Sequence, residues 1–240
     1  MTRESGRKIR MEQNELKELM KLFFKPHPWH GVSPGAGFPA ELSVFIEQVP
    51  TDTVKYEVDK ASGYLKLDRP QKFSSQPPCL YGFVPRTYCG TRVGNYSAMK
   101  TGNSEIKGDG DPIDICVFSE RSISHGDLLV TGIPIGGIRM LDAHEADDKI
   151  IAVMKDDAVY GQITDVTGLP EQLVERLCHY FLSYKDLPSS TKARNVEIES
   201  VYGRAEALKV LQYSLEDYED KFDNPNQRFQ DLIEHLTNAR

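Results

Sequence analysis

Apolar residues recur three and four positions apart near both ends of the chain. This spacing is typical of one face of a helix, and it predicts helices over residues 11–26 and 208–222 and at 229–236. A further helix is expected over residues 170–184, because a proline suits its first turn and its apolar residues form a single stripe. The two ends of the chain are therefore expected to be helical.

Between these ends, short apolar or alternating runs separated by turn residues predict β-strands. Such spacing is typical of a closed or sandwiched antiparallel sheet. We therefore expect an α+β fold with a β-barrel at its centre and flanking α-helices. The expected strands lie at residues 43–49, 54–58, 64–67, 113–118, 128–133, 137–140, 150–154 and 195–201.

No linker or repeat divides the sequence, so residues 1–240 are expected to form one domain. Residues 1–10 are basic and are predicted to be a mobile extension. We expect residues 11–42 to be an N-terminal helix and loop, and residues 206–240 to be a C-terminal helical extension. The Gly/Asn/Ser-rich stretch 87–108 is predicted to be a long loop without regular structure.

The composition is that of an ordinary globular protein, with 39% hydrophobic and 27% charged residues and a net charge of −7. The negative charge argues against broad electrostatic binding to nucleic acid. No apolar run approaches the ~18 residues of a membrane span, and the first ten residues lack the apolar stretch of a signal peptide. We therefore predict a cytoplasmic protein. Its four cysteines form no C-x-x-C pair and are expected to be free thiols.

Three carboxylates lie within six residues in the sequence Asp109-Gly-Asp111-Pro-Ile-Asp114. Acidic runs are usually solvent-exposed turns, and that interpretation stays open here. Asp114, however, leads directly into an apolar strand, and the spacing is not that of an EF-hand loop. A second acidic group, Asp142, Asp147 and Asp148, precedes Lys149. Converging carboxylates require a hard divalent cation, and Mg²⁺ is the usual one.

Cationic residues accompany these acids. In the strand 54–58, Lys55 and Glu57 share one face, and this face could equally lie in water. Glu47 has a similar place in the strand before it. Arg69 offers a bidentate donor for phosphate oxygens. At the end of the helix 170–184, Tyr184 could belong to the core, and the following Lys185 could simply face the C-terminal dipole.

Together these segments resemble soluble family I inorganic pyrophosphatase, and they occur in the family's order. The resemblance covers roughly residues 43–205. The matching pieces are Ile46-Glu47, Val54-Lys55-Tyr56-Glu57-Val58-Asp59-Lys60, Leu67-Asp68-Arg69, Pro78-Cys79-Leu80-Tyr81-Gly82, Asp109-Gly-Asp111-Pro-Ile-Asp114, Asp142 to Lys149, and Tyr184-Lys185-Asp186-Leu187.

The resemblance implies a five-stranded OB-like barrel that hydrolyses pyrophosphate with several Mg²⁺ ions. It implies that Asp109, Asp114 and Asp147 are metal ligands, joined by Asp142 when the substrate brings a further ion. Asp111 would be the general base that activates the attacking water. The remaining roles are also implied by the resemblance: Glu47 and Glu57 as supporting acids, and Lys55, Arg69, Tyr81, Lys149, Tyr184 and Lys185 as substrate-binding groups.

The sequence departs from the family pattern in three respects. Pro77 stands where the family often has a tyrosine, so one phosphate-side hydroxyl is expected to be missing. Tyr81 and Asp109 are 28 positions apart, which makes residues 87–108 an insertion, and both termini are extended. The apolar stripes of the terminal helices exceed what a small barrel requires, so we expect a homo-oligomer.

Two other functions stay open at this stage. An OB-type barrel can bind single-stranded nucleic acid without catalysis, although at least six acids line the expected groove. A two-metal hydrolase of nucleotides or phosphomonoesters would use similar residues. The sequence does not separate these phosphate substrates from pyrophosphate.

Overall fold

The computed structural model describes residues 25–72, 75–185, 196–222, 231 and 234. The predicted extension 1–10 and the predicted helices at 11–26 and 229–236 therefore lie almost wholly outside the described residues, as do Asp186 and Leu187. Residues 27–222 form one compact unit, which contains all the elements discussed below.

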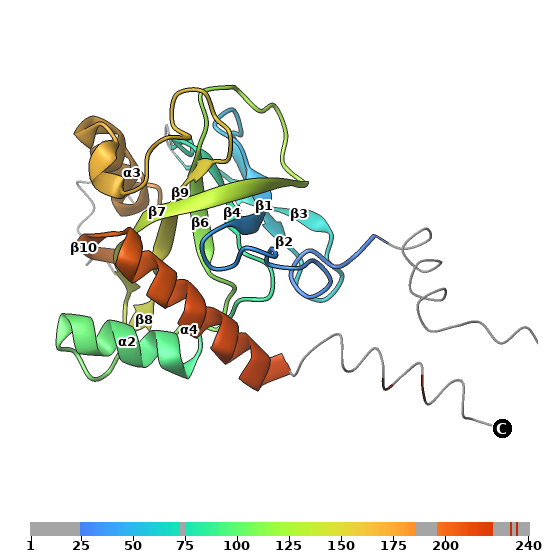
Figure 1. The fold of residues 1–240 in the computed structure, drawn as a ribbon, viewed down its shortest axis with the longest axis vertical. Coiled ribbons are helices and arrows are strands. Elements are labelled where there is room, and N and C mark those ends of the chain that lie inside the picture. Colours follow the sequence, from blue (N-terminus) through green and yellow to red (C-terminus); the bar gives the residue numbers. More distant parts are fainter. Residues whose placement is uncertain (1–24, 73–74, 186–195, 223–230, 232–233, 235–240) are drawn as a thin grey trace, which may run out of the picture. The chain divides into compact units, whose positions relative to one another are not determined.

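This unit consists of a mixed sheet, a separate hairpin and a small number of helices (Figure 1). The predicted α+β class is confirmed. The strands are β1 (Leu42–Gln48), β2 (Val54–Val58), β3 (Leu65–Pro70), β4 (Leu80–Phe83), β5 (Lys107–Gly108), β6 (Asp114–Phe118), β7 (Leu128–Asp142), β8 (Glu145–Ala146), β9 (Lys149–Met154) and β10 (Val196–Gly203). The helices are α2 (Thr91–Thr101), the 3₁₀-helix η1 (Val166–Gly168), α3 (Glu171–Ser183) and α4 (Arg204–Phe222).

Strand pairing in the main sheet follows the order β1-β4-β6-β9-β7-β8-β5, and β10 also pairs with β7. β1 is bonded to β7 as well as to β4, so the pairings of β1, β4, β6, β9 and β7 return to the first strand. β6 and β9 run parallel, as do the short strands β5 and β8, and the other pairs are antiparallel. β2 and β3 form the separate hairpin.

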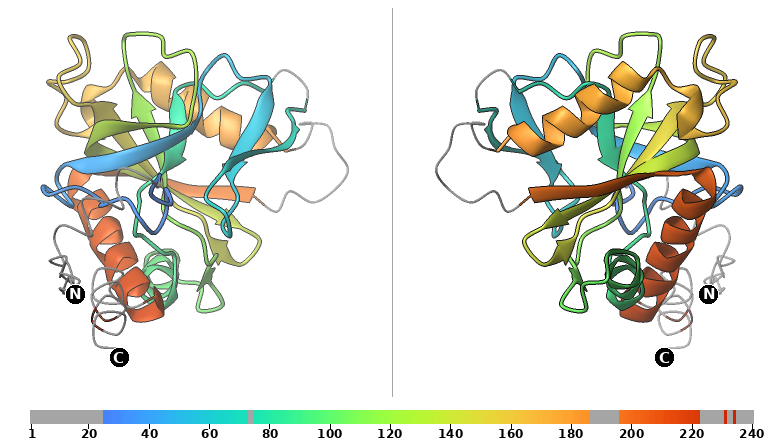
Figure 2. Two further views of the ribbon diagram at one scale, coloured as in Figure 1. Left: turned by 90° about the vertical axis from the view of Figure 1, so that its right-hand side faces the viewer. Right: turned by 90° about the vertical axis from the view of Figure 1, so that its left-hand side faces the viewer.

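Both faces of the central strands are covered. On β6, Ile115 and Val117 belong to the apolar cluster that α2 and α4 complete, whereas Cys116 and Phe118 belong to the cluster beneath α3. Figure 2 shows α3 on the opposite side of the strands from α2 and α4. Burial on both faces explains why β6 and β9 are apolar at almost every position rather than alternating.

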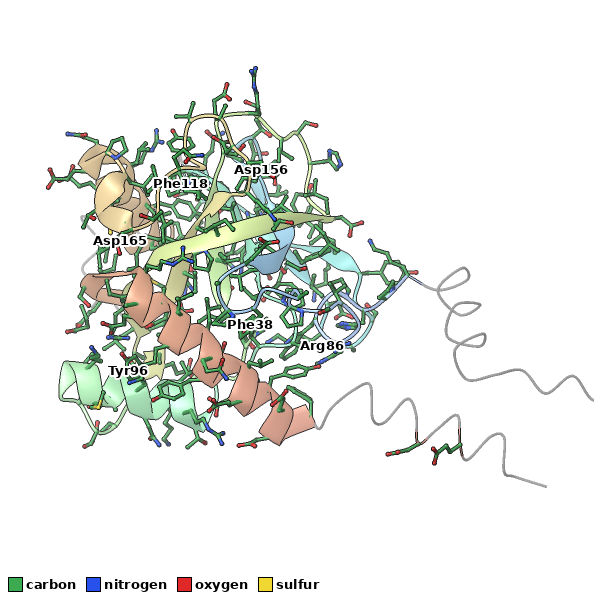
Figure 3. The ribbon with its side chains drawn as sticks, in the orientation of Figure 1. Phe38, Arg86, Tyr96, Phe118, Asp156 and Asp165 are labelled. Atoms are coloured by element: carbon green, nitrogen blue, oxygen red, sulfur yellow. The ribbon has the colours of Figure 1, made fainter. Side chains whose placement is uncertain are left out.

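The structure corrects two expectations. The stretch 87–108 is not an unstructured loop, because it contains α2 and β5. Val93 and Tyr96 of α2 are buried, and Tyr96 packs against Tyr213 of α4 at 5.3 Å between ring centroids (Figure 3). The strands expected at 128–133 and 137–140 are one continuous strand, β7. Within this strand, Gly137 leaves room for the ring of Tyr202, whose atoms would lie 2.5 Å from a Cβ at this position.

Among the described helices, none combines the length and the apolar character needed to cross a membrane.

Candidate active site

A cavity of about 270 Å³ opens where β1, the β2–β3 hairpin, β4 and the starts of β6 and β9 meet. The cavity brings together every residue to which the resemblance assigned a role at the site, although these residues come from segments far apart in the chain. Its lining includes Glu47, Lys55, Glu57, Arg69, Tyr81, Asp109, Asp111, Asp114, Asp142, Asp147, Lys149, Tyr184 and Lys185.

Strand register places Asp114 beside Lys149. Each is the first residue of its strand, and the parallel pairing of β6 with β9 makes them direct neighbours. Lys149 Nζ donates to Asp114 Oδ2 at 2.5 Å and also to Asp147 Oδ1. Tyr81 Oη donates to the same Asp114 oxygen at 2.6 Å. A buried ammonium and a phenol therefore hold this carboxylate in one position.

The main chain holds the first acidic segment in place. Cys89 N donates to Asp111 O at 2.7 Å, and Ile113 N donates to Thr87 Oγ1 at 3.0 Å. Within the segment, Asp111 N donates to Asp109 Oδ1 at 2.9 Å. Thr87 and Cys89, just before α2, therefore position the backbone of the segment 109–113. None of these hydrogen bonds uses the carboxylate of Asp111.

Further cationic groups of the lining come from the β2–β3 hairpin and from the end of α3. Lys55 and Arg69 are register partners on the hairpin. Lys55 Nζ is 3.5 Å from Glu57 Oε2 and 3.8 Å from Asp68 Oδ2. Lys185, just after α3, pairs with Asp142 at 2.5 Å between Nζ and Oδ2. Each cation thus has an acidic neighbour in the structure.

Burial disfavours ionisation of several of these acids. Burial raises the pKa of Glu47 to about 8, although Val58 N donates to its carboxylate at 2.7 Å. Burial and the nearby charge of Asp147 raise the pKa of Asp109 to about 8, and burial also raises that of Asp147. Burial lowers the pKa of Lys149, but Asp114 and Asp147 outweigh it and raise that pKa well above its usual value.

The donor set of the cavity fits a hard divalent cation. Its acids offer only oxygen ligands, and none of the described residues that line the cavity is a histidine or a cysteine. A nearby cation would favour the ionised form of Asp109 and Asp147, which burial opposes. Within the described residues, no group of three or more acidic, histidine or cysteine side chains is already converged on a single point. Asp114 and Asp147 are instead bridged by Lys149.

The sequence assigned no role to six residues of the cavity lining: Trp29, Val58, Lys60, Phe83, Pro112 and Glu145. Lys60 Nζ donates to Asp111 Oδ1. Lys60 ends the segment 54–60, which carries part of the family resemblance, so the sequence could have indicated it as a site residue. Trp29 is 5% exposed and its indole donates to Thr87 O at 2.8 Å. In the sequence, the only feature that marks Trp29 is its position in the Gly/Pro-rich stretch 26–38. Pro77 is buried and is not part of the lining.

A cavity whose lining combines several carboxylates with lysine, arginine and tyrosine side chains suits an enzyme that acts on a phosphate compound together with a divalent cation. Residues 44–219 match the family described as inorganic pyrophosphatase. This chain therefore belongs to the inorganic pyrophosphatase family, whose members are hydrolases.

Relatives of known name and structure agree with this assignment. Inorganic pyrophosphatase of Chlamydia trachomatis serovar L2 is 50% identical over 195 residues, which cover 80% of this chain and 93% of that protein. Soluble inorganic pyrophosphatase 5 of Arabidopsis thaliana is 34% identical over 209 residues, 87% of this chain and 86% of that protein. The crystal structure of the Thermus thermophilus inorganic pyrophosphatase superposes with a TM-score of 0.67 at 26% identity, covering 81% of this chain and 99% of that one.

Proposed function

We propose that this protein hydrolyses inorganic pyrophosphate to two phosphates with Mg²⁺ and an attacking water. The supporting observation is that Asp109, Asp111 and Asp114 line one cavity together with Lys55 and Arg69. Pyrophosphate is small and highly charged, so its recognition depends on neutralising charge rather than on apolar contacts. Transfer of its phosphoryl group requires mainly positioning and electrostatic stabilisation.

Mg²⁺ would be held by Asp109, Asp114 and Asp147, with Asp142 at the rim. When bound, the cation neutralises phosphate charge and lowers the pKa of a water. Glu47 and Glu57 would support the site from β1 and β2. Lys149, which bridges Asp114 and Asp147, would be free to contact phosphate once those carboxylates turn toward the cation.

Asp111 is the proposed general base. Its side chain is 41% exposed to the cavity, whereas its main chain is anchored by Cys89. A carboxylate that is open to solvent on a fixed backbone can accept a proton from a water at a defined position. Lys60 donates to this carboxylate and would have to release it during the reaction.

The proposed substrate-binding groups are spread around the lining of the cavity. Arg69 provides a fork of donors that matches two phosphate oxygens, and Lys55 and Lys185 provide point charges. Tyr81 and Tyr184 contribute hydroxyl groups to the lining. Together these groups would offset the charge that develops on the leaving phosphate.

Further features of the protein belong to the same proposal. The pairings that lead from β1 through β4, β6, β9 and β7 back to β1 support the five-stranded OB-like barrel. A homo-oligomer and a cytoplasmic location stay predictions, and light scattering at micromolar concentration would contradict the first by showing a monomer.

Other phosphate compounds, such as nucleotides and phosphomonoesters, are the main alternative substrates, because a two-metal hydrolase of these compounds would use similar residues. Assays with a nucleoside triphosphate and a phosphomonoester beside pyrophosphate separate these possibilities. An OB-type nucleic-acid-binding protein is a weaker alternative, since acids crowd the same cavity. Filter binding of single-stranded DNA tests it.

The decisive assay measures phosphate release from pyrophosphate with and without Mg²⁺, for the native protein and for Asp111→Asn. We expect release only with Mg²⁺, and a loss of about 10²–10⁴-fold in kcat for the variant, since general base catalysis contributes that much. Asp156→Asn is the matched control, because Asp156 is exposed and lies outside the cavity lining (Figure 3). No release by the native protein, or full activity of Asp111→Asn, contradicts the proposal.

A further inference from the structure

Two buried charged residues lie behind the candidate active site. Arg139 on β7 is 3% exposed and Asp148, just before β9, is 2% exposed, and neither lines the cavity. Arg139 Nη2 donates to Asp148 Oδ2 at 3.3 Å. Tyr202 Oη on β10 donates to the same carboxylate oxygen at 2.9 Å. We refer to Arg139, Asp148 and Tyr202 as the hub.

The hub is joined to the site through the main chain. Asp148 lies between Asp147 and Lys149, and both of these neighbours line the cavity. Along an extended chain, successive side chains point in opposite directions. Asp148 therefore points away from the cavity when its neighbours point into it. The hydrogen bonds that Arg139 and Tyr202 donate to Asp148 consequently restrict the positions of Asp147 and Lys149.

The hub also reaches the outer helices. Arg139 Nη1 donates to Glu206 Oε1 on α4 at 2.7 Å, and Lys100 Nζ of α2 donates to Glu206 Oε2 at 3.0 Å. The guanidinium of Arg139 lies 5.3 Å from the ring of Tyr96 on α2 and 5.1 Å from that of Tyr202. One arginine thus links both outer helices to the segment that carries Asp147.

Stability alone does not account for this arrangement. Removing two charges from water has a large desolvation cost, so an apolar pair of similar size is often as stable as a buried ion pair. Arg139 Nε and Asp148 Oδ1 are, in addition, buried without a hydrogen-bond partner among the described residues. Such unsatisfied atoms reduce stability further. The gain from the hub must therefore lie elsewhere, in the position it imposes on its neighbours.

We propose that Arg139 and Asp148 are positioning residues that hold Asp147 and Lys149 in the geometry needed for cation binding and reaction. The Arg139–Asp148 ion pair anchors the segment 147–149 to β7, and Glu206 and Lys100 anchor Arg139 in turn to α4 and α2. The inserted helix α2 is therefore coupled to the active site. The catalytic part of this inference rests on the proposed pyrophosphatase activity.

The test uses Arg139→Lys, Asp148→Asn and the double variant. Lysine keeps the charge of Arg139, but it cannot span Asp148 and Glu206 with a planar fork. We expect each single variant to lower kcat at least about tenfold at saturating pyrophosphate and Mg²⁺, because small displacements of reacting groups have such effects. We also expect the half-saturating Mg²⁺ concentration to rise at least threefold. The loss of kcat in the double variant should be no larger than the loss in the more impaired of the two single variants, because the two residues act as one unit.

Two further variants keep the test informative. Asp165→Asn is the control, because Asp165 accepts from Arg204 N at the start of α4 at 2.9 Å and is outside the hub (Figure 3). It should lower the melting temperature without changing the half-saturating Mg²⁺ concentration. If Asp148→Asn does not fold, the partly exposed Glu206→Gln takes its place, with a smaller rise in the half-saturating Mg²⁺ concentration expected.

The outcomes separate the two proposals. Hub variants that melt earlier but keep kcat and Mg²⁺ dependence within twofold of native overturn the hub, as does a double variant in which the single losses multiply. A native protein that releases no phosphate overturns the proposed function instead. In that case titration calorimetry with MgCl₂ alone still tests the hub, because Arg139→Lys should weaken Mg²⁺ binding and an unchanged affinity contradicts the proposal.

Discussion

Glu47 and Glu57 lie on β1 and β2, which follow one another in the sequence. Their surroundings nevertheless differ. Glu47 is 6% exposed, and its carboxylate accepts a hydrogen bond from Val58 N. Glu57 remains partly exposed beside Lys55. Burial raises the pKa of Glu47 to about 8. Residue type and alternation predicted where both acids lie, but only packing decided which of them is desolvated.

His30 should make the stability of the protein depend on pH. Its ring stacks on Trp29 at 4.5 Å between centroids, and its Nδ1 lies 2.8 Å from Tyr218 Oη. Burial, followed by the charges of His27 and Arg86, lowers its pKa from 6.5 to about 4. Between these two pH values His30 is protonated in the unfolded chain but neutral in the folded protein. The free energy of unfolding therefore falls as pH decreases from 6.5 to about 4.

The measurement compares urea unfolding of the native protein and His30→Gln at pH 7 and pH 4.5. The ring is partly exposed, so we expect its share of the acid-induced loss to be about 1–2 kcal/mol, after discounting for solvent screening. The variant should lack this share. His125→Gln, at an exposed histidine, serves as the control and should follow the native curve. An equal loss in native protein and His30→Gln would contradict the assignment.

At the scale of elements, α2 shows how a distant residue can determine where a helix starts. Its N-cap residue, Gly90, has no side chain to accept a hydrogen bond. Asp217 of α4 accepts instead from the N–H groups of Gly90, Arg92 and Val93, each at 3.0 Å. The acceptor is more than a hundred residues away in sequence, so no local capping signal marked this helix.

Replacing this distant cap should destabilise the protein. Asp217 is 4% exposed, and Asp217→Asn would turn an amide donor toward backbone N–H groups. We expect a loss of about 1–3 kcal/mol in the free energy of unfolding, typical of an unsatisfied buried group, measured by urea denaturation. Asp220→Asn is the matched control, because Asp220 pairs with the same Arg92 but is exposed. It should change stability by less than about 0.5 kcal/mol. Equal effects of the two variants would contradict a capping role.

For the whole molecule, the acidic surplus acquires a local meaning. The net charge is −7, and the lining of the cavity alone includes eight acids: Glu47, Glu57, Asp109, Asp111, Asp114, Asp142, Glu145 and Asp147. Their mutual repulsion and desolvation destabilise the folded state when no cation is bound. A divalent cation that binds only the folded protein would remove this cost and shift the unfolding equilibrium.

We therefore expect MgCl₂ to raise the melting temperature, and a chelator to reverse the increase. At 100 times the dissociation constant the gain is about 2.7 kcal/mol for one site, or about 5–10 °C for a protein of this size. KCl at matched ionic strength should have little effect, which separates specific binding from screening. Asp114→Asn should reduce the Mg²⁺-dependent increase. An equal increase in KCl, or an unchanged one in Asp114→Asn, would contradict cation binding by these acids.

Hydrophobic periodicity alone predicted most of the larger elements. The strands near 43–49, 54–58 and 150–154 and the helix near 170–184 lie where the pattern placed them, because burial on one or two faces leaves a period that can be read locally. The sequence also indicated the acidic segment 109–114 as a candidate site, since Asp114 leads directly into an apolar strand. Periodicity did not predict α2 or the continuity of β7. At both places the relevant contact comes from a residue distant in sequence: Asp217 caps α2, and the ring of Tyr202 lies against Gly137 of β7.

The sequence by itself determined the family resemblance, since residue types and their order are what such a resemblance compares, and from it came the prediction of which residues carry the chemistry. Tertiary structure decided how they meet. Only the parallel register of β6 and β9 places Lys149 beside Asp114, and only long-range packing brings Trp29 and Lys60 to the cavity. The buried link from Arg139 to Asp148 also depends on the fold. The physical reason is the same in each case: register, desolvation and ion pairing depend on neighbours in space, and these neighbours are distant along the chain.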